Sequence, residues 1–241
     1  MFMGQSQNSW LTRRVQGAIQ LGLRGAYSGV QVDPVKYLLH LRRAYGLPIA
    51  SFREMHAVPL SVVDYLAEKT ISTSRKVALA EGAGLGLGGI MTILPDVGLL
   101  STITFRMIQR LSLIHGFEYS SNDEVAELWL ATASAAGVDI GKDWLEKQVV
   151  ERFVPRVVER IACRAGAEVA EKWVARAVPL VSSVLGGTLN YYFIRGWGNR
   201  ARRHFRERYL LTRNPSVPIE HNPLVLRKKS APSLAEVAPP L

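Results

Sequence analysis

Two long apolar stretches, each containing glycines, place the strongest constraint on how this chain can fold. Residues 82–105 contain one charge, Asp96, and residues 177–194 contain none. Both approach the roughly 20 residues that a helix needs to span a bilayer. Pro95 and several glycines interrupt the first stretch, and Pro179 and polar side chains interrupt the second, so neither is typical of a single membrane anchor. Three interpretations remain open: buried core helices, which we favour, reversible docking on a membrane, and stable spans.

The glycines in these stretches are spaced for close contact between helices. Gly82 and Gly86 are four residues apart, as are Gly84 and Gly88, so each pair lies on one helix face where another backbone can approach. Residues 84–89 also match G-x-G-x-x-G, but no strand precedes this pattern, as a dinucleotide site would require. We therefore predict two glycine-rich apolar helical hairpins, with these close-packing glycines: Gly82, Gly84, Gly86, Gly88, Gly89, Gly186 and Gly187.

Helix signals recur in the rest of the chain, and strand signals are scarce. Asp33 followed by Pro34 can start a helix that Gly46 ends. Ser121 and Glu124 have the spacing of a capping box in front of another helix. Helical apolar spacing continues through residues 60–82 and, with a break or kink expected at Pro155, through residues 142–178. The expected fold class is all-α, a multi-helix bundle with the two apolar hairpins and a disordered C-terminal tail.

Charged side chains at the borders of the apolar stretches form a candidate site. Asp96 and Arg110 are fourteen residues apart, which places them about 40° apart on one helix face. Buried charges are costly unless they are paired. A structural ion network is the favoured interpretation and an acid–base site the alternative. The predicted buried cluster comprises Glu81, Asp96, Arg106, Arg110 and Asn190.

Standard catalytic and metal-binding patterns do not occur in the sequence. The five histidines form no HExxH or similar pair, and no GxSxG or GxxxxGK[ST] motif is present. The single cysteine, Cys163, cannot form an internal disulfide. We predict no cofactor and no metal, leave the catalytic residues unknown, and lean towards a protein that is not an enzyme.

The segment 195–213 is the most basic part of a chain whose formal net charge is +10, with seven arginines against Glu207 alone. Aromatic residues lie beside these arginines, a mixture suited to a membrane interface. Anionic lipid is the favoured ligand and a solvated helix face the alternative. Nucleic acid is disfavoured because no recognition motif accompanies the charge. The candidate lipid- or anion-binding residues are Arg195, Trp197, Arg200, Arg202, Arg203 and Arg206.

Two blocks within residues 60–211 resemble the EcsC protein family. The first block has an E-G pair, spaced glycines, an aspartate and an arginine-bearing helix, at Glu81, Gly82, Gly88, Gly89, Asp96, Arg106 and Gly116. The second has a proline, a glycine pair, an asparagine, an alanine and Phe-Arg, at Pro179, Gly186, Gly187, Asn190, Ala201, Phe205 and Arg206.

The resemblance implies a bacterial protein from a family that is named after a protein encoded beside a transporter. The family's biochemical role is largely uncharacterised, so the resemblance supplies no catalytic residues. We expect a cytoplasmic binding or accessory protein that contacts anionic lipid, peripheral to or inserted in the inner membrane, with a membrane protein as a further kind of partner. The alternatives are a lipid-directed hydrolase that uses the buried carboxylates and a nucleic-acid-binding protein. The oligomeric state is left open.

Changes in composition along the chain predict three parts. Residues 1–32 form an N-terminal amphipathic segment, and residues 33–213 form an EcsC-like helical domain. Residues 214–241 contain half of the twelve prolines and are expected to be a disordered tail.

Overall fold

The computed structural model describes residues 3–28, 32–86, 93–139, 150–173 and 182–212, and all regular elements in these ranges are helices. The all-α prediction is therefore confirmed. The elements are α1 (Met3–Ser28), α2 (Pro34–Tyr45), the short 3₁₀ helix η1 (Phe52–Ala57), α3 (Leu60–Gly86), α4 (Ile93–Ile114), α5 (Asn122–Ala135), α6 (Val150–Trp173) and α7 (Ser182–Thr212).

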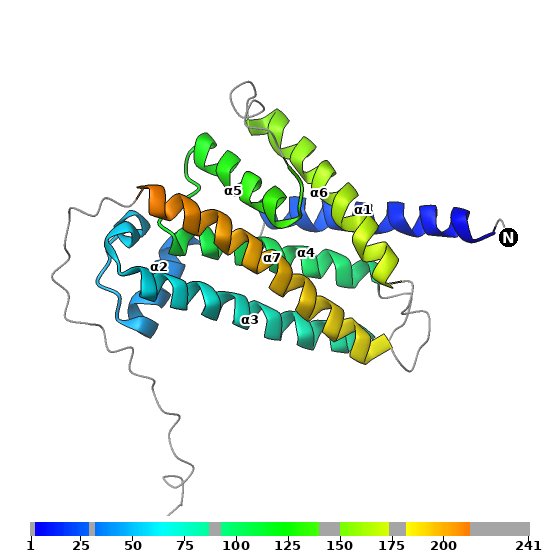
Figure 1. The fold of residues 1–241 in the computed structure, drawn as a ribbon, viewed down its shortest axis with the longest axis horizontal. Helices are drawn as coiled ribbons and strands as arrows, with labels where there is room; N and C mark the ends of the chain where they lie inside the picture. The colour runs from blue at the N-terminus through cyan, green and yellow to red at the C-terminus, as the bar shows by residue number, and fades with distance from the viewer. Residues whose placement is uncertain (1–2, 29–31, 87–92, 140–149, 174–181, 213–241) are drawn as a thin grey trace, which may run out of the picture.

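Helix α4 lies at the centre of the bundle and contacts α1, α3, α5 and α7. Helices α3 and α7 run side by side, and α1 and α6 pack together on another side of α4 (Figure 1). Phe105, Met107, Ile108 and Leu111 of α4 are completely buried. The apolar composition of this helix is therefore explained by its central position, as the core-helix interpretation predicts.

Local capping sets the bounds of α2 and α5 as predicted. The Asp33 carboxylate accepts a hydrogen bond from the backbone N–H of Lys36, and Pro34 occupies the first turn of α2. Gly46 ends α2 in the left-handed conformation, with φ 65°, where a side chain would be strained. Ser121 and Glu124 form the reciprocal bonds of a capping box at the start of α5.

Two helices differ from their predicted extents. Helix α3 continues past residue 82 to Gly86. Pro155 does not break α6, which runs through it from Val150 to Trp173. Pro155 is exposed and is the sixth residue of the helix, where a proline removes one backbone hydrogen bond and the helix continues beyond it.

Close helix crossings occur at glycines. A Cβ on Gly187 of α7, one of the glycines named from the sequence, would lie 2.8 Å from the carbonyl oxygen of Leu79 in α3. The sequence reasoning missed Gly22, where a Cβ would lie 2.5 Å from the carbonyl oxygen of Gly98, and Gly166, which approaches Gln16. These glycines let α1 pack closely against α4 and α6.

Several other predictions concern glycines and segments that the structure describes only in part. Gly82 is buried in α3, and Gly84, Gly86 and Gly186 lie within helices. Gly88, Gly89 and the tail 214–241 lie outside the described residues. The three-part division of the chain therefore stays a prediction.

Candidate anion-binding site

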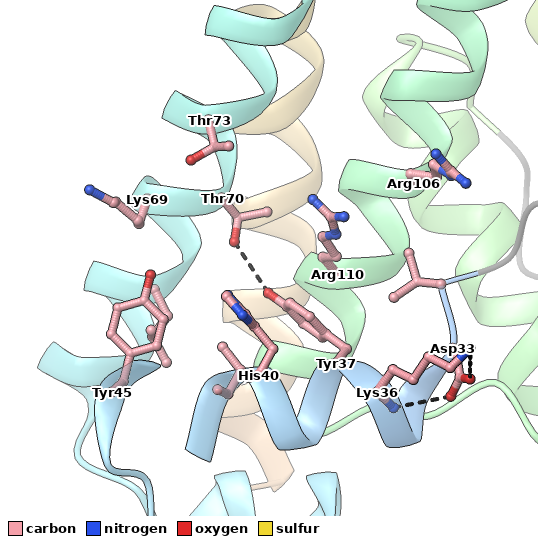
Figure 2. A pocket seen from close by; sticks show the side chains of 13 residues that line it. Asp33, Lys36, Tyr37, His40, Tyr45, Lys69, Thr70, Thr73, Arg106 and Arg110 are labelled. Atoms are coloured by element: carbon pink, nitrogen blue, oxygen red, sulfur yellow. Dashed lines mark hydrogen bonds and ion pairs between the residues drawn. The ribbon is translucent and has the colours of Figure 1, made fainter. Parts of the chain in front are cut away.

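A pocket with a volume of about 540 Å³ lies between α2, α3 and α4 (Figure 2). Its lining combines aromatic, hydroxyl and cationic side chains: Val32, Asp33, Lys36, Tyr37, His40, Leu41, Tyr45, Leu66, Lys69, Thr70, Thr73, Arg106 and Arg110.

The start of α2 is held in place by two hydrogen bonds to the backbone of Val32, two residues before the helix. The backbone N–H of Val32 donates to Oε1 of Gln109, at 3.1 Å, and the hydroxyl of Tyr119 donates to the Val32 carbonyl. Gln109 lies in α4 and Tyr119 lies in the loop that follows α4. These two hydrogen bonds therefore place the start of α2 beside α4. Leu41 then anchors the helix in the core.

The pocket carries an excess of positive charge. Four cationic side chains line it, and Asp33 is the only carboxylate among its lining residues. That carboxylate lies 3.6 Å from the ammonium group of Lys36 and also caps α2. Lys69 and Arg106 are exposed on either side of the pocket, on α3 and α4 (Figure 2). A concave surface lined by one sign of charge concentrates ligands of the opposite sign.

Arg110 occupies the inner part of this pocket. Its guanidinium carbon lies 5.7 Å from the ring centroid of Tyr37, a cation–π contact (Figure 2). Its Nε is buried and donates no hydrogen bond within the described part of the chain. The hydroxyls of Tyr37 and Thr70 lie 3.5 Å apart. Burial raises the pKa of Tyr37 to about 12, so its phenol stays protonated and can donate a hydrogen bond.

The predicted buried charged cluster forms only in part. Asp96 is 1 % exposed, and one of its carboxylate oxygens accepts a hydrogen bond from Nδ2 of Asn190 at 2.8 Å. Glu81 and Arg106 are exposed, and Arg110 lines the pocket instead, so the expectation that all five residues meet in the interior is wrong. Asp96 and Arg110 are on one helix, but fourteen residues of helix span about 21 Å, and different helices pack at each position.

The arginines of α7 mostly have partners within the bundle. Arg202 lies 3.0 Å from Glu68 and Arg206 lies 3.0 Å from Asp64, both in α3. The side chain of Arg200 donates to the carbonyl of Ala135. These contacts fasten α7 to its neighbouring helices.

Trp197 is 3 % exposed and stacks on Phe193, so it does not lie at the surface where an interfacial role would require it. Arg195 and Arg203 are exposed. Lipid contact by these two arginines stays a prediction.

The sequence reasoning identified α2 as a helix but missed its part in the site. A signal was present in the sequence, because α2 combines the apolar Val35 and Leu39 with basic residues and contains no acidic residue. The structure adds that Val35 and Leu39 are both exposed. Tyr37, Lys69 and Thr70 could not be found from local patterns, since they become neighbours only through tertiary packing.

Two surveys of the described residues concern metals and membranes. No group of three or more histidine, cysteine, aspartate or glutamate side chains within them could hold a metal ion. Among these residues, one helical segment, Pro95–Ile114, is long and apolar enough to cross a bilayer, but 67 % of its apolar window is buried inside the bundle. A core helix meets the same criterion, so this segment is weak evidence for a membrane span.

The comparisons with known proteins agree with the resemblance seen in the sequence. The chain is 28 % identical over 204 residues to Protein EcsC of Bacillus subtilis (strain 168), covering 83 % of this chain and 86 % of that protein. No solved structure matches the chain. The model of the EcsC protein family matches residues 4–210, and the chain therefore belongs to the EcsC protein family.

Proposed function

We propose that this protein acts by docking on a membrane surface that carries anionic lipid, and that the outer face of α2 makes the contact. The observation that carries the proposal is the exposure of this helix. Leu41 is the only residue of α2 that is buried. Val35 is 67 % exposed and Leu39 is 42 % exposed. These two apolar side chains lie one turn apart and therefore share a face.

Charge on the same helix supports an anionic surface as the partner. Lys36, Arg42 and Arg43 are exposed around the two apolar side chains. An interfacial helix combines buried apolar area with electrostatic attraction to anionic lipids. Each Lys or Arg near such a surface contributes about 1 kcal/mol. The cytoplasmic leaflet carries a negative surface potential, so the proposed location is the cytoplasmic face of the inner membrane.

The hydrolase alternative gains no support from the pocket. Asp96 is buried against Asn190 and is not among the residues that line the pocket between α2, α3 and α4. We therefore propose a role in binding.

Flotation with vesicles tests the proposal. The full-length protein is mixed at low salt with vesicles of phosphatidylethanolamine and phosphatidylglycerol, and the bound fraction is measured. A Val35→Asp/Leu39→Asp double variant places charge on the docking face. Leu21→Asp in α1 is the matched control, because Leu21 is 74 % exposed and lies outside α2.

We expect the wild type and Leu21→Asp to float with anionic vesicles and the α2 double variant to remain in the soluble fraction. Binding of the wild type should fall as salt rises, because exposed charges are screened. The proposal is overturned if the wild type does not float, or if the α2 variant floats as well as the wild type. Loss of flotation in Leu21→Asp alone would assign docking to α1 instead.

A further inference from the structure

We infer that the pocket between α2, α3 and α4 binds the phosphate group of a phosphomonoester lipid headgroup, with Arg110 as its principal contact. The pocket meets a lipid only where α2 brings it to the bilayer, so in naming a lipid this inference rests on the proposed function. The recognition of phosphate itself rests on the pocket's own residues.

Arg110 differs from the arginines that serve a structural role in this bundle. Arg202 and Arg206 are each paired with a carboxylate of α3. No carboxylate pairs with Arg110 among the described residues, and its buried Nε has no hydrogen-bond partner there. A buried donor without a partner is costly. Arg110 also lines the pocket, and a guanidinium group at a pocket wall can bind phosphate oxygens, often in bidentate geometry.

Hydroxyl groups beside Arg110 supply further donors of the kind that phosphate oxygens accept. Tyr37, Thr70 and Thr73 line the same pocket, and the protonated phenol of Tyr37 lies on the pocket side of α2 (Figure 2). These hydroxyl groups can donate hydrogen bonds to the phosphate oxygens, and the cationic side chains balance the negative charge of the ligand.

The charge of the pocket favours a monoester over a diester. Four cationic side chains and one carboxylate line the pocket. A phosphomonoester carries a charge of about −1.5 to −2 at neutral pH, with three terminal oxygens that accept hydrogen bonds. A phosphodiester carries a single negative charge and has fewer terminal oxygens, so it satisfies the pocket less completely.

The pocket adjoins the face of α2 that is proposed to dock. Lys36 and His40 line the pocket and also line a neighbouring surface hollow together with Leu39 and Arg43. A bilayer that receives Leu39 would therefore bring its headgroups to the mouth of the pocket. This continuity favours a lipid as the source of the phosphate over a soluble compound.

Isothermal titration of the full-length protein tests the inference with soluble probes. The probes are dihexanoyl phosphatidic acid below its micelle concentration, dihexanoyl phosphatidylglycerol, glycerol 3-phosphate and inorganic phosphate. Arg110→Gln removes the principal contact, and Lys69→Gln removes the charge of an exposed side chain that lines the same pocket. Arg164→Gln on α6 is the control, because it removes one exposed positive charge away from the pocket. Circular dichroism melts verify that each variant is folded.

We expect saturable binding of dihexanoyl phosphatidic acid and weaker binding of the phosphatidylglycerol. Arg110→Gln should weaken the former about tenfold or more, as expected for loss of charge-assisted hydrogen bonds. Lys69→Gln should weaken it by a smaller factor and Arg164→Gln not at all. If Arg110→Gln does not fold, the Lys69→Gln result decides.

Three results would overturn the inference. Equal binding by the wild type, Arg110→Gln and Lys69→Gln, or no binding of any probe, would show that the pocket is not a phosphate site. Binding of glycerol 3-phosphate or inorganic phosphate as tightly as phosphatidic acid would overturn the lipid source. The Val35→Asp/Leu39→Asp variant separates the two proposals, because it should still bind dihexanoyl phosphatidic acid while it fails to float with vesicles.

Discussion

Replacement of Gly22 by alanine should destabilise the bundle, whereas the same change at Gly17 or Gly25 of the same helix should stabilise it. A Cβ on Gly22 would lie 2.5 Å from the carbonyl oxygen of Gly98 and 2.8 Å from Cβ of Ser101. These atoms belong to the backbone and to a short side chain of α4, so α1 must move away. No atom lies within 4 Å of a Cβ placed on Gly17 or Gly25.

The magnitude follows from two opposing effects. Alanine is about 1 kcal/mol more favourable than glycine inside a helix. Overpacking of a close contact costs about 1–3 kcal/mol. We therefore expect Gly22→Ala to lower the free energy of unfolding by about 1 kcal/mol, and Gly17→Ala to raise it by up to about 1 kcal/mol.

Urea unfolding followed by circular dichroism measures this difference. The slope of the free energy against urea should be the same in all three variants, so that the midpoints report stability. Equal midpoints for Gly22→Ala and Gly17→Ala would show that α1 and α4 do not cross at this short distance, and would refute the reasoning about glycine contacts.

Two further predictions concern buried polar groups. Asp96→Ala should lower the free energy of unfolding by about 2–3 kcal/mol, because it removes a hydrogen bond to a charged group and leaves Asn190 without that partner. The exposed Glu81→Ala serves as its control in the same urea assay and should change stability by less than about 0.5 kcal/mol; equal effects would place Asp96 at the surface. Burial lowers the pKa of His115 to about 4, and the hydrogen bond from its Nδ1 to the Leu111 carbonyl opposes this only in part. The pKa of His115 in the folded chain lies below the unfolded value near 6.5, so at pH values between these two pKa values the unfolded chain binds more protons than the folded chain. The free energy of unfolding should therefore fall by roughly 3 kcal/mol as the pH drops from about 6.5 to 4. Thermal melts across this range should show a shallower decline for His115→Gln than for the wild type, and parallel curves would contradict a buried neutral His115.

Helix bounds were predictable where the determining residues lie within a few positions of each other. Asp33, Gly46 and the capping pair Ser121 and Glu124 act on backbone groups of their own turn, so their effect can be recognised without knowledge of the tertiary fold. The all-α class followed from the same kind of local pattern.

Burial of individual side chains was harder to predict because it depends on which helix covers each face. Trp197 lies beside arginines in sequence and is buried, while Glu81 lies beside an apolar stretch and is exposed. The Asp96–Asn190 contact joins residues 94 positions apart. Both residues were members of the predicted cluster, but their contact, and their separation from Arg106 and Arg110, depend on the packing of α2, α3, α4 and α7.

The pocket itself could not be predicted, since its lining comes from residues between Val32 and Arg110 on three helices. No short motif joins Lys36, Lys69 and Arg110. Only the charge pattern of α2 could be recognised from the sequence. The proposed docking depends on this helix.

The depth of a spin label on α2 tests the proposed docking most directly. Cys163 is exposed and is the only cysteine of the chain, so Cys163→Ser provides a background for a label at Leu39→Cys, with Leu21→Cys as the control. Accessibility to oxygen and to a water-soluble nickel chelate is measured with and without anionic vesicles. We predict that the label at position 39 gains oxygen contact and loses nickel contact on vesicles, while the label at position 21 does not change. An unchanged label at position 39 on protein that is bound to the vesicles would contradict docking through α2.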